Sequence, residues 1–191
     1  MRHLIIVLAA LLCIGCAQLP SAVPVAPKPQ SPAVVFDIDG TLTPDVFAVT
    51  EVRPDAANAA RLFADKGYRI IYLSARVGLL QAGIPQWLKS NGFPEGSKHL
   101  SQTDEDHNRP ELFKARILKE FFAQGWDVRY GYGDSPTDFL AYADAGIPKE
   151  RVFALKRRGD AECQKGTWQD CLKGWTEHLA FISSVPPARA N

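Results

Sequence analysis

Five short apolar segments, separated by longer amphipathic stretches, set the strongest limit on how this chain folds. The apolar segments are residues 33–38, 69–75, 97–101, 128–134 and 151–155. Between and after them, the spacing of apolar residues predicts helices at 54–66, 77–90, 109–121, 136–145 and 168–182. Strands that alternate with helices in this way form a mainly parallel sheet covered by helices. We therefore expect one α/β, Rossmann-like domain over residues 34–184, with a polar tail at 185–191.

The composition narrows the class of protein further. The 191 residues include 22 Lys and Arg against 21 Asp and Glu, and 46% of them are hydrophobic. This apolar content is enough for an ordinary core and excludes disorder over most of the chain. A net charge of +1 provides no broad basic surface for a phosphate backbone, so we expect no nucleic-acid partner.

The N-terminus has the features of an export signal. An apolar stretch from Leu4 to Gly15 follows Arg2 and His3, and it is shorter than the roughly 20 residues that cross a membrane. Gly15-Cys16-Ala17 resembles a bacterial lipoprotein processing site, which predicts a signal peptide at 1–15 and lipidation of Cys16. The expected location is the cell envelope, with the protein anchored by lipid to the outer membrane and facing the periplasm. A signal without lipidation and a buried core helix are the alternatives.

Residues 16–33 connect this segment to the predicted domain. They contain five prolines and almost no charge, which favours an extended, semi-rigid tether. The alternative is an irregular arm that packs on the domain.

Two carboxylates at the end of the first predicted strand indicate chemistry. Asp37 and Asp39 lie two residues apart in the segment FDIDGTLT, followed by Gly40 and Thr41. In an open α/β sheet, ligands bind at the carboxyl ends of the strands. Two carboxylates brought together there repel each other unless a cation is present, and oxygen ligands suit Mg²⁺. The alternative is an acidic turn without a ligand.

Four separate segments occur in the order of the four motifs of the haloacid dehalogenase superfamily of phosphotransferases, and on them this chain resembles that superfamily. They are the segment FDIDGTLT, the strand end YLSAR with Ser74, the helix residue Lys114 and the segment GDSPTD. The resemblance implies that Asp37 attacks phosphorus and that Asp39 is the general acid and base. It further implies that Ser74 and Lys114 bind the phosphoryl group. Lys98 is a competing candidate for the role of Lys114.

The same resemblance implies a Mg²⁺ site and further substrate contacts. Asp134 and Asp138 in GDSPTD would be acidic residues of the metal site, together with Asp37 and the Asp39 backbone carbonyl. Backbone N–H groups near Gly40 and Thr41 would bind phosphate oxygens. The guanidinium of Arg76, directly after the second predicted strand, is placed either to contact phosphate or to form an ion pair.

Over nearly the whole domain the sequence is similar to the lipin-type phosphatidate phosphatase domain and its relative at the C-terminus of phosphatidylinositol-transfer proteins. The segments AGIPKERVFAL and GWTEHLAFI add to this resemblance. It implies a phosphomonoesterase that acts on phosphatidate or another lipid phosphate. The alternatives are an envelope acid phosphatase or nucleotidase for soluble substrates, and a phosphatidate-binding module without turnover. Segments 42–73 and 75–113 are too short for a folded cap domain, which leaves the site open to a large substrate.

The remaining candidate residues are cysteines, histidines and a basic cluster. Cys163 and Cys171 in an oxidising compartment predict a disulfide, with a metal site as the alternative. Surface or capping roles are expected for the scattered histidines His99, His107 and His178. The basic run 156–158 is either a solvated loop or a contact for a head group. The sequence does not indicate the oligomeric state.

Overall fold

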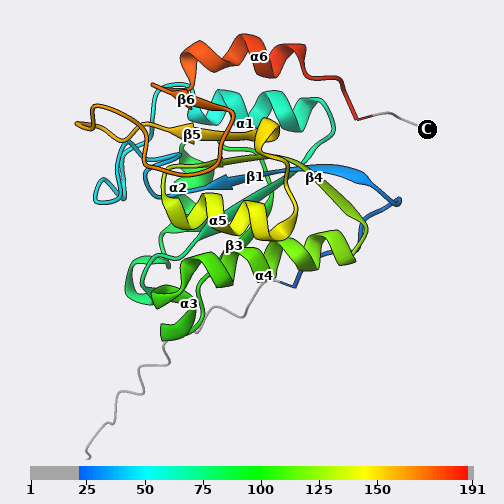
Figure 1. The fold of residues 1–191 in the computed structure, drawn as a ribbon, viewed down its shortest axis with the longest axis horizontal. Helices are drawn as coiled ribbons and strands as arrows, with labels where there is room; N and C mark the ends of the chain where they lie inside the picture. The colour runs from blue at the N-terminus through cyan, green and yellow to red at the C-terminus, as the bar shows by residue number, and fades with distance from the viewer. Residues whose placement is uncertain (1–21, 189–191) are drawn as a thin grey trace, which may run out of the picture.

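The computed structural model describes residues 22–188, which form one six-stranded parallel sheet with the strand order β3-β2-β1-β4-β5-β6 (Figure 1). The strands are β1 (Ser31–Asp37), β2 (Arg69–Ser74), β3 (Ser97–Leu100), β4 (Trp126–Gly133), β5 (Val152–Leu155) and β6 (Asp170–Leu172). Every neighbouring pair is parallel. The expected α/β, Rossmann-like architecture is therefore confirmed. The carboxyl ends of β1, β2, β4 and β5 meet at one edge.

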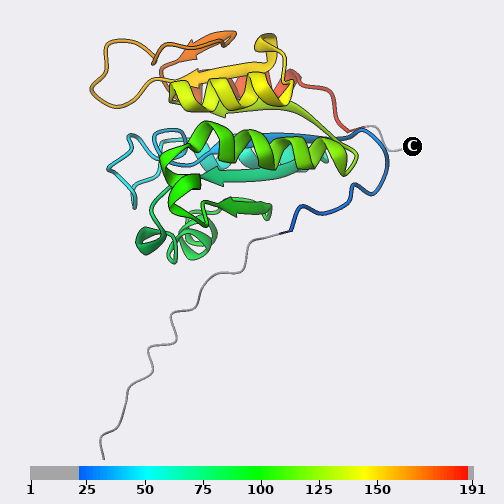
Figure 2. The ribbon, with the colours of Figure 1, turned by 60° about the horizontal axis from the view of Figure 1, so that its bottom comes forward.

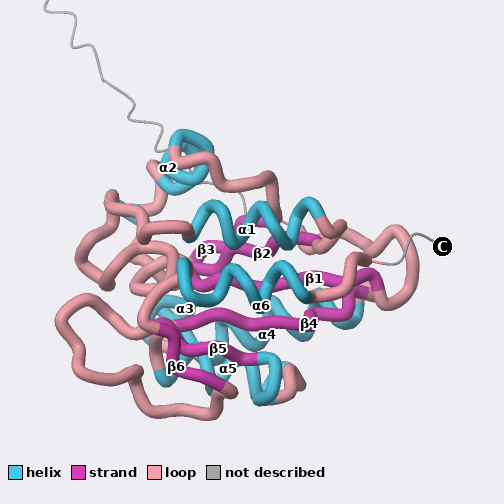
Figure 3. Tube along the Cα trace, turned by 90° about the horizontal axis from the view of Figure 1, so that it is seen from above, coloured by secondary structure: helices cyan, strands magenta, loops and turns pink. Residues whose placement is uncertain are grey.

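Helices cover both faces of the sheet. They are α1 (Ala56–Asp65), α2 (Ile84–Ser90), α3 (Asp104–Asn108), α4 (Pro110–Ala123), α5 (Pro136–Ala145) and α6 (Leu179–Ser184). Helices α1 and α6 lie on one face, and α4 and α5 lie on the other (Figures 1 and 2). Figure 3 shows α1 and α6 running over the sheet, seen from above. Two hydrophobic cores result, one on each side.

Strand β1 shows why a continuous apolar run marks the centre of the sheet. Successive side chains of a strand point to opposite faces. Accordingly Val34 and Phe36 pack into the core beside α1, whereas Ala33 and Val35 pack into the core beside α4 and α5. All four are fully buried, because β1 is paired on both sides and covered on both faces.

Two predicted helices differ from the structure. The segment expected to be a helix at 77–90 is a 3₁₀ turn, η1 (Gly78–Leu80), followed by α2. The segment expected to be a helix at 168–182 is instead β6, the 3₁₀ turn η3 (Thr176–His178) and α6. In the second case, residues Asp170–Leu172 pair with β5. The backbone groups of this segment are therefore bonded within the sheet and not within a helix. Helix α3 has no counterpart among the predicted elements.

The described part of the proline-rich segment packs on the domain. Val23 is buried, and the Trp126 indole Nε1 donates to the Pro24 carbonyl over 2.7 Å. The Ala26 N–H donates to the Gln124 carbonyl at 2.9 Å, and β1 already begins at Ser31. For residues 22–33, the packed arm is therefore the correct interpretation, and the free tether and the domain boundary at residue 34 are wrong.

The predicted signal peptide and Cys16 fall outside the described residues. Within residues 22–188, no helix combines the length and the apolar character needed to cross a membrane.

A disulfide joins Cys163 to Cys171, as predicted. It connects the loop after β5 to the edge strand β6, which pairs through only three residue positions. The cross-link thus holds a short edge strand and the loop before it to the domain.

The prediction of a surface role is wrong for two histidines, and His178 takes the N-cap position of α6 without a side-chain cap hydrogen bond. His99 and His178 are buried, and the Nε2 atom of His178 lies 3.1 Å from the hydroxyl of Tyr132. The rings of Phe153 and Phe181 pack against His178 at centroid distances of 4.4 and 4.7 Å. Burial lowers the pKa of His178 to about 4.

This burial makes stability depend on pH. An unfolded histidine takes up a proton near its ordinary pKa of about 6.5, whereas native His178 stays neutral down to about pH 4. The unfolded form of this histidine therefore binds more protons in this window, and the contribution of His178 to stability falls as the pH is lowered from 6.5 towards 4. This contribution opposes that of Asp134, whose raised pKa favours the folded state at lower pH. We expect His178→Gln to remove the His178 contribution, so that its melting temperature at about pH 5, relative to that at about pH 7, is higher than in wild type. His107→Gln, at an exposed position, serves as the control. An equal pH dependence of the melting temperature in all three proteins would contradict this explanation.

Candidate active site

The site is built around Asp37, the last residue of β1. Its side chain is buried, and its Oδ1 atom accepts a hydrogen bond of 2.5 Å from the Nζ of Lys114. Lys114 comes from α4 and is itself buried, although the two residues are 77 positions apart in the chain. A buried ammonium is costly unless carboxylates compensate it, so the contact fixes both groups at the sheet edge.

Asp138 is the second carboxylate on Lys114. Its Oδ1 atom accepts from the Lys114 Nζ at 2.5 Å. Its Oδ2 atom accepts from the backbone N–H groups of Asp134 and Ser135, both at 3.1 Å. The Ser135 side chain in turn caps α5 in a capping box with Asp138. The motif GDSPTD thus folds as a strand end followed at once by a capped helix, which directs both carboxylates to Asp37.

The cluster combines three buried carboxylates with few counter-charges. Asp37, Asp134 and Asp138 each place a carboxylate oxygen within 4.8 Å of the others. Burial, together with the nearby Asp138 carboxylate, raises the pKa of Asp37 well above its usual range. The same two causes raise the pKa of Asp134 to about 7. Burial alone would lower the pKa of Lys114, but Asp138 and Asp37 outweigh it and raise that pKa above its ordinary value.

The donor set fits a hard divalent cation. The Oδ2 atom of Asp37 is buried without a hydrogen-bond partner, which is unusual for a carboxylate oxygen in a protein interior. Asp134 offers a second carboxylate beside it. Oxygen-only ligands of this kind suit Mg²⁺. Asp138 belongs to the same group of buried carboxylates, and its hydrogen bonds also position Lys114 and the start of α5.

Asp39 has a separate environment. Its Oδ2 atom accepts from the Ser74 hydroxyl at 2.6 Å, and its Oδ1 atom accepts from the Arg76 Nε and Nη2 at 2.9 and 2.5 Å. The predicted residues Ser74 and Arg76 are therefore next to the predicted acid and base. Of the two roles expected for Arg76, the structure shows the ion pair.

The turn after β1 requires glycine at position 40. Gly40 has φ +85°, and a Cβ atom there would lie 2.0 Å from Asp134 Oδ2. Its N–H donates to the Thr43 hydroxyl at 2.8 Å, so the prediction that this group binds phosphate is not met in this conformation. The hydroxyl of Thr41 is fully buried without a hydrogen-bond partner.

Arg53 is a buried residue next to the candidate site that the sequence did not reveal. Its guanidinium is buried and donates to the carbonyls of Gly40, Thr43, Pro44 and Lys156 at 2.7 to 3.1 Å. It thereby ties the turn after β1 to the loop after β5. A single arginine before a helix is not part of any sequence motif, so only its tertiary contacts show that Arg53 joins these loops.

Replacing Arg53 by methionine is expected to lower the free energy of unfolding by about 2 kcal/mol, because buried carbonyls lose charged hydrogen bonds. Arg61→Met is a matched control, since Arg61 is exposed and reaches only one carbonyl, that of Gly92. Urea unfolding of both variants measures the difference. Equal stability of the two variants would show that Arg53 does not hold these loops.

A second missed residue is Arg157, whose Nε donates to Asp134 Oδ2. It belongs to the basic run 156–158, for which the sequence allows only two general interpretations. Lys98, the competitor of Lys114, contacts the Gly96 carbonyl and Glu95 at the start of β3 and is not part of the site. Lys114 is therefore the lysine that the fold brings to Asp37.

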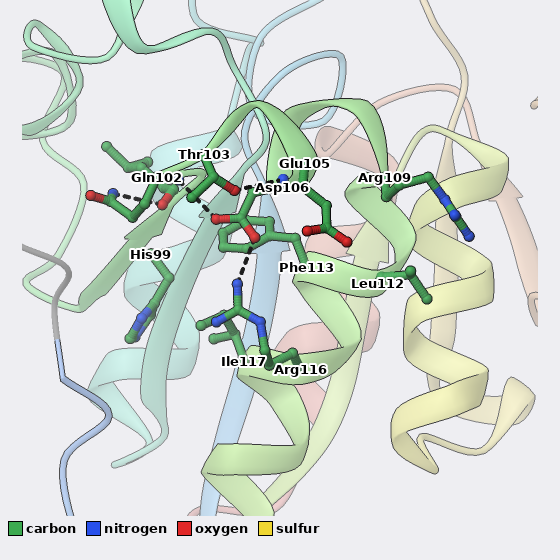
Figure 4. A pocket seen from close by; sticks show the side chains of 11 residues that line it. His99, Gln102, Thr103, Glu105, Asp106, Arg109, Leu112, Phe113, Arg116 and Ile117 are labelled. Carbon is green, nitrogen blue, oxygen red and sulfur yellow. Dashed lines mark hydrogen bonds and ion pairs between the residues drawn. The ribbon is translucent and has the colours of Figure 1, made fainter.

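A cavity of about 580 Å³ lies elsewhere, along β3, α3 and the outer side of α4 (Figure 4). Arg116 and Asp106 form an ion pair of 2.6 Å across it, drawn as a dashed line. None of the predicted site residues lines this cavity. The predicted site residues therefore gather at the sheet edge and not at this cavity.

Two curated relatives match most of the domain. The chain is 31% identical over 166 residues to human membrane-associated phosphatidylinositol transfer protein 1, covering 83% of this chain and 13% of that protein. It is 29% identical over 153 residues to the mouse phosphatidate phosphatase LPIN3, covering 66% of this chain and 18% of that protein. The chain thus spans less than a fifth of the length of each relative.

The fold also resembles solved structures. One is the cobalt-bound deoxy-D-mannose-octulosonate 8-phosphate phosphatase of Haemophilus influenzae. It has a TM-score of 0.51 and 17% identity, over 80% of this chain and 86% of that one. This likeness agrees with the haloacid-dehalogenase-like fold that the four motifs implied.

A family model described as the LNS2 domain of PITM 1-3 matches residues 34–156. The match covers more than half of the 191 residues and includes all four motifs, from Asp37 to Asp138. The chain therefore belongs to the LNS2 domain family, which joins lipin-type and phosphatidylinositol-transfer-protein relatives.

Proposed function

We propose that this protein is a Mg²⁺-dependent phosphomonoesterase in which Asp37 is the nucleophile. One observation carries the proposal: the buried Asp37 carboxylate has one oxygen fixed by Lys114 and the other without a partner, beside Asp134. In a purely structural ion pair, a buried carboxylate oxygen is normally hydrogen-bonded. A nucleophile that must face both a phosphorus atom and a cation requires one free oxygen.

The residues have distinct roles in the proposed reaction. An Asp37 oxygen attacks phosphorus, the bond from phosphorus to the leaving oxygen breaks, and Asp39 donates a proton to that oxygen. In the second step Asp39 takes a proton from water, whose oxygen attacks phosphorus and releases Asp37. Lys114 has three N–H donors and uses one each on Asp37 and Asp138, so its third is free to bind a phosphoryl oxygen.

Asp37 and Asp134 are the residues that would hold Mg²⁺. When bound, Mg²⁺ supplies positive charge that offsets the repulsion between these carboxylates and the phosphate. Asp39 reaches its role only after its carboxylate leaves Arg76 and Ser74, since both of its oxygens are held in this structure. Ser74 and Arg76 would then be available to the phosphoryl oxygens.

For the substrate we propose phosphatidate or another lipid phosphate. The support is the relationship to a protein named as a phosphatidate phosphatase, together with the absence of a cap domain among residues 22–188. The proposed location, on the periplasmic side of a bacterial envelope membrane, depends on the Gly15-Cys16 sequence and on export. Soluble phosphomonoesters remain the alternative substrates, and binding of phosphatidate without turnover remains the alternative to catalysis.

A substrate panel tests the proposal. Purified protein is incubated with phosphatidate in vesicles, p-nitrophenyl phosphate and nucleoside monophosphates, with Mg²⁺ or with a chelator. We expect phosphate release that needs Mg²⁺ and is fastest with phosphatidate. Faster phosphate release from nucleoside monophosphates than from phosphatidate would indicate that the substrate is a soluble phosphomonoester and not a lipid phosphate. Binding of phosphatidate without any phosphate release would exclude the enzyme.

A further inference from the structure

The catalytic edge of the sheet carries exposed apolar side chains that the proposed reaction does not use. Phe47, in the loop after β1, is 90% exposed, and Leu79, in η1 after β2, is 92% exposed. Val77 and Leu80 beside Leu79 are also exposed. Phenylalanine and leucine side chains that are about nine-tenths exposed leave most of their apolar surface in water, and their place on neighbouring loops at one edge of the sheet suits a contact surface.

The loops that carry these residues are firmly placed. Asp45 accepts from the N–H of Phe47 at 2.9 Å and of Ala48 at 3.0 Å, which fixes the turn at Phe47. Arg158 bonds Asp45 and Glu51, so the loop after β5 braces the loop after β1. The exposed position of Phe47 is therefore held by side-chain contacts on both sides.

The second loop is held equally well and lies next to the first. The buried Gln81 side chain donates to the carbonyls of Arg76 and Ser101, which anchors η1 to the ends of β2 and β3. Trp87, which follows η1 in α2, donates to the Thr50 carbonyl at 2.9 Å. In Figures 1 and 2 these loops extend from the same edge of the sheet as the loop after β5.

The candidate catalytic residues are on the same chain segments as the apolar side chains. Asp39 starts the loop that leads to Phe47, and Arg76, which holds Asp39, is three residues from Leu79. A surface that accepts Phe47 and Leu79 would therefore be at the same edge of the sheet as Asp37 and Asp39.

Shape and charge favour a lipid surface over a folded partner. The apolar groups are single side chains on separate loops, which suit insertion between acyl chains. Segments 43–53, 75–83 and 156–166 contain six basic and four acidic residues, and the segment 75–83 has Arg76 as its only charged residue. This balance gives a net positive charge that does not repel an anionic membrane, and Arg158 pairs with both Asp45 and Glu51.

We infer that Phe47 and Leu79 are membrane-inserting residues that seat the catalytic edge on a phospholipid surface. The inference rests on the proposed function for its purpose, since it presents a lipid phosphate to Asp37 without a cap domain. The insertion itself depends only on the exposed loops and is measurable without turnover.

The experiment reports on the insertion first. The full chain, with its own N-terminus in every variant, is bound to phosphatidylcholine and phosphatidylglycerol vesicles with or without brominated lipid. Phe47→Trp adds an emitter to one loop, and Leu140→Trp adds one to the exposed side of α5, where Leu140 is 60% exposed. The wild-type protein already contains four tryptophans. In each variant, the emission of the added indole is therefore obtained by subtracting the emission of the wild-type protein from that of the variant.

We expect brominated lipid to quench the added emission of the Phe47→Trp variant and to leave that of the Leu140→Trp variant unchanged. Bromine quenches an indole only at close range, so the quenching places position 47 among the acyl chains. If the added emission of vesicle-bound Phe47→Trp protein is equal with and without brominated lipid, the inference is overturned.

Turnover gives the second measurement. In the double variant Phe47→Ser, Leu79→Ser, phosphate release from vesicle-borne phosphatidate should fall at least about tenfold. Release from p-nitrophenyl phosphate should stay at the wild-type rate. Leu140→Ser is the control and should change neither rate.

The outcomes separate this inference from the proposed function. If wild type releases no phosphate from any substrate but the Phe47→Trp variant is quenched, the enzyme is excluded and the insertion stands. If turnover is normal and that variant is not quenched, the insertion is excluded and the enzyme stands. A dimer that forms without lipid and that the double variant abolishes would assign the surface to a second copy of the chain and overturn the inference.

Discussion

Replacing Lys114 by methionine is expected to lower the free energy of unfolding by about 3–5 kcal/mol and to abolish phosphatase activity. The ammonium compensates two carboxylates that are themselves buried, Asp37 and Asp138. Methionine fills a similar volume but leaves both carboxylates without their cation. Because the carboxylates are buried, water does not take the place of the ammonium. Removing one partner of a buried ionic cluster is costly for this reason, even where the intact cluster contributes little net stability.

Lys119→Met on the same helix is the matched control. Lys119 forms an ion pair with Asp144 at 2.9 Å, but both side chains are more than half exposed, so their contribution is about 0–1 kcal/mol. Urea unfolding at about pH 7 compares the two variants, and phosphate release measures their activity. A Lys114→Met protein as stable as Lys119→Met would mean that Asp37 and Asp138 are not charged around Lys114 in the folded state.

The convergence of the candidate site residues at one edge of the sheet is the feature that the sequence predicted best. Apolar runs identified five of the six strands, and the parallel order brings Asp37 and Asp134 to one edge. Ser74, at the end of β2, joins them there through its bond to Asp39. Because these residues sit at strand ends, their convergence follows from topology alone. Predicting Lys114 required the order of the motifs in addition, because lysines are common on helix surfaces and a single one does not indicate a site.

The segment from Trp168 to Trp175 shows where such prediction fails. Its apolar residues at 168, 171, 172 and 175 have the spacing of a helix face, which predicts a helix. In the structure Asp170–Leu172 pairs with β5, and the disulfide at Cys171 holds the strand to the preceding loop. Long-range pairing outweighed the local pattern, and a single sequence contains no record of that pairing.

Two arginines beside the site, Arg53 and Arg157, were missed for a related reason. Arg53 reaches four carbonyls and Arg157 reaches Asp134, yet neither lies in a motif. Their contacts join loops that are far apart in the chain, as the bond from Arg53 to the Lys156 carbonyl shows. Motifs at strand ends thus predict the chemical groups of the site, whereas the residues that position them become visible only in the fold.

Replacing Asp37 by asparagine is expected to reduce phosphate release at least about 10³-fold, because the amide cannot attack phosphorus. The folded protein should not be destabilised. Burial and Asp138 raise the pKa of Asp37, so the native state favours the neutral form of this group more than the unfolded state does. An aspartate of this kind stabilises the fold at low pH, and that contribution is lost as the pH rises through its folded pKa. Asparagine is neutral at every pH.

We therefore expect Asp37→Asn to melt at or above the wild-type temperature at about pH 8, while it is inactive. This combination distinguishes a nucleophile from a structural residue, whose loss would lower activity and melting temperature together. Asp144→Asn, at an exposed site on α5, is the control and should leave both quantities unchanged. An active Asp37→Asn protein would remove Asp37 as the nucleophile. An inactive protein with a lowered melting temperature would instead assign Asp37 a structural role as the partner of Lys114.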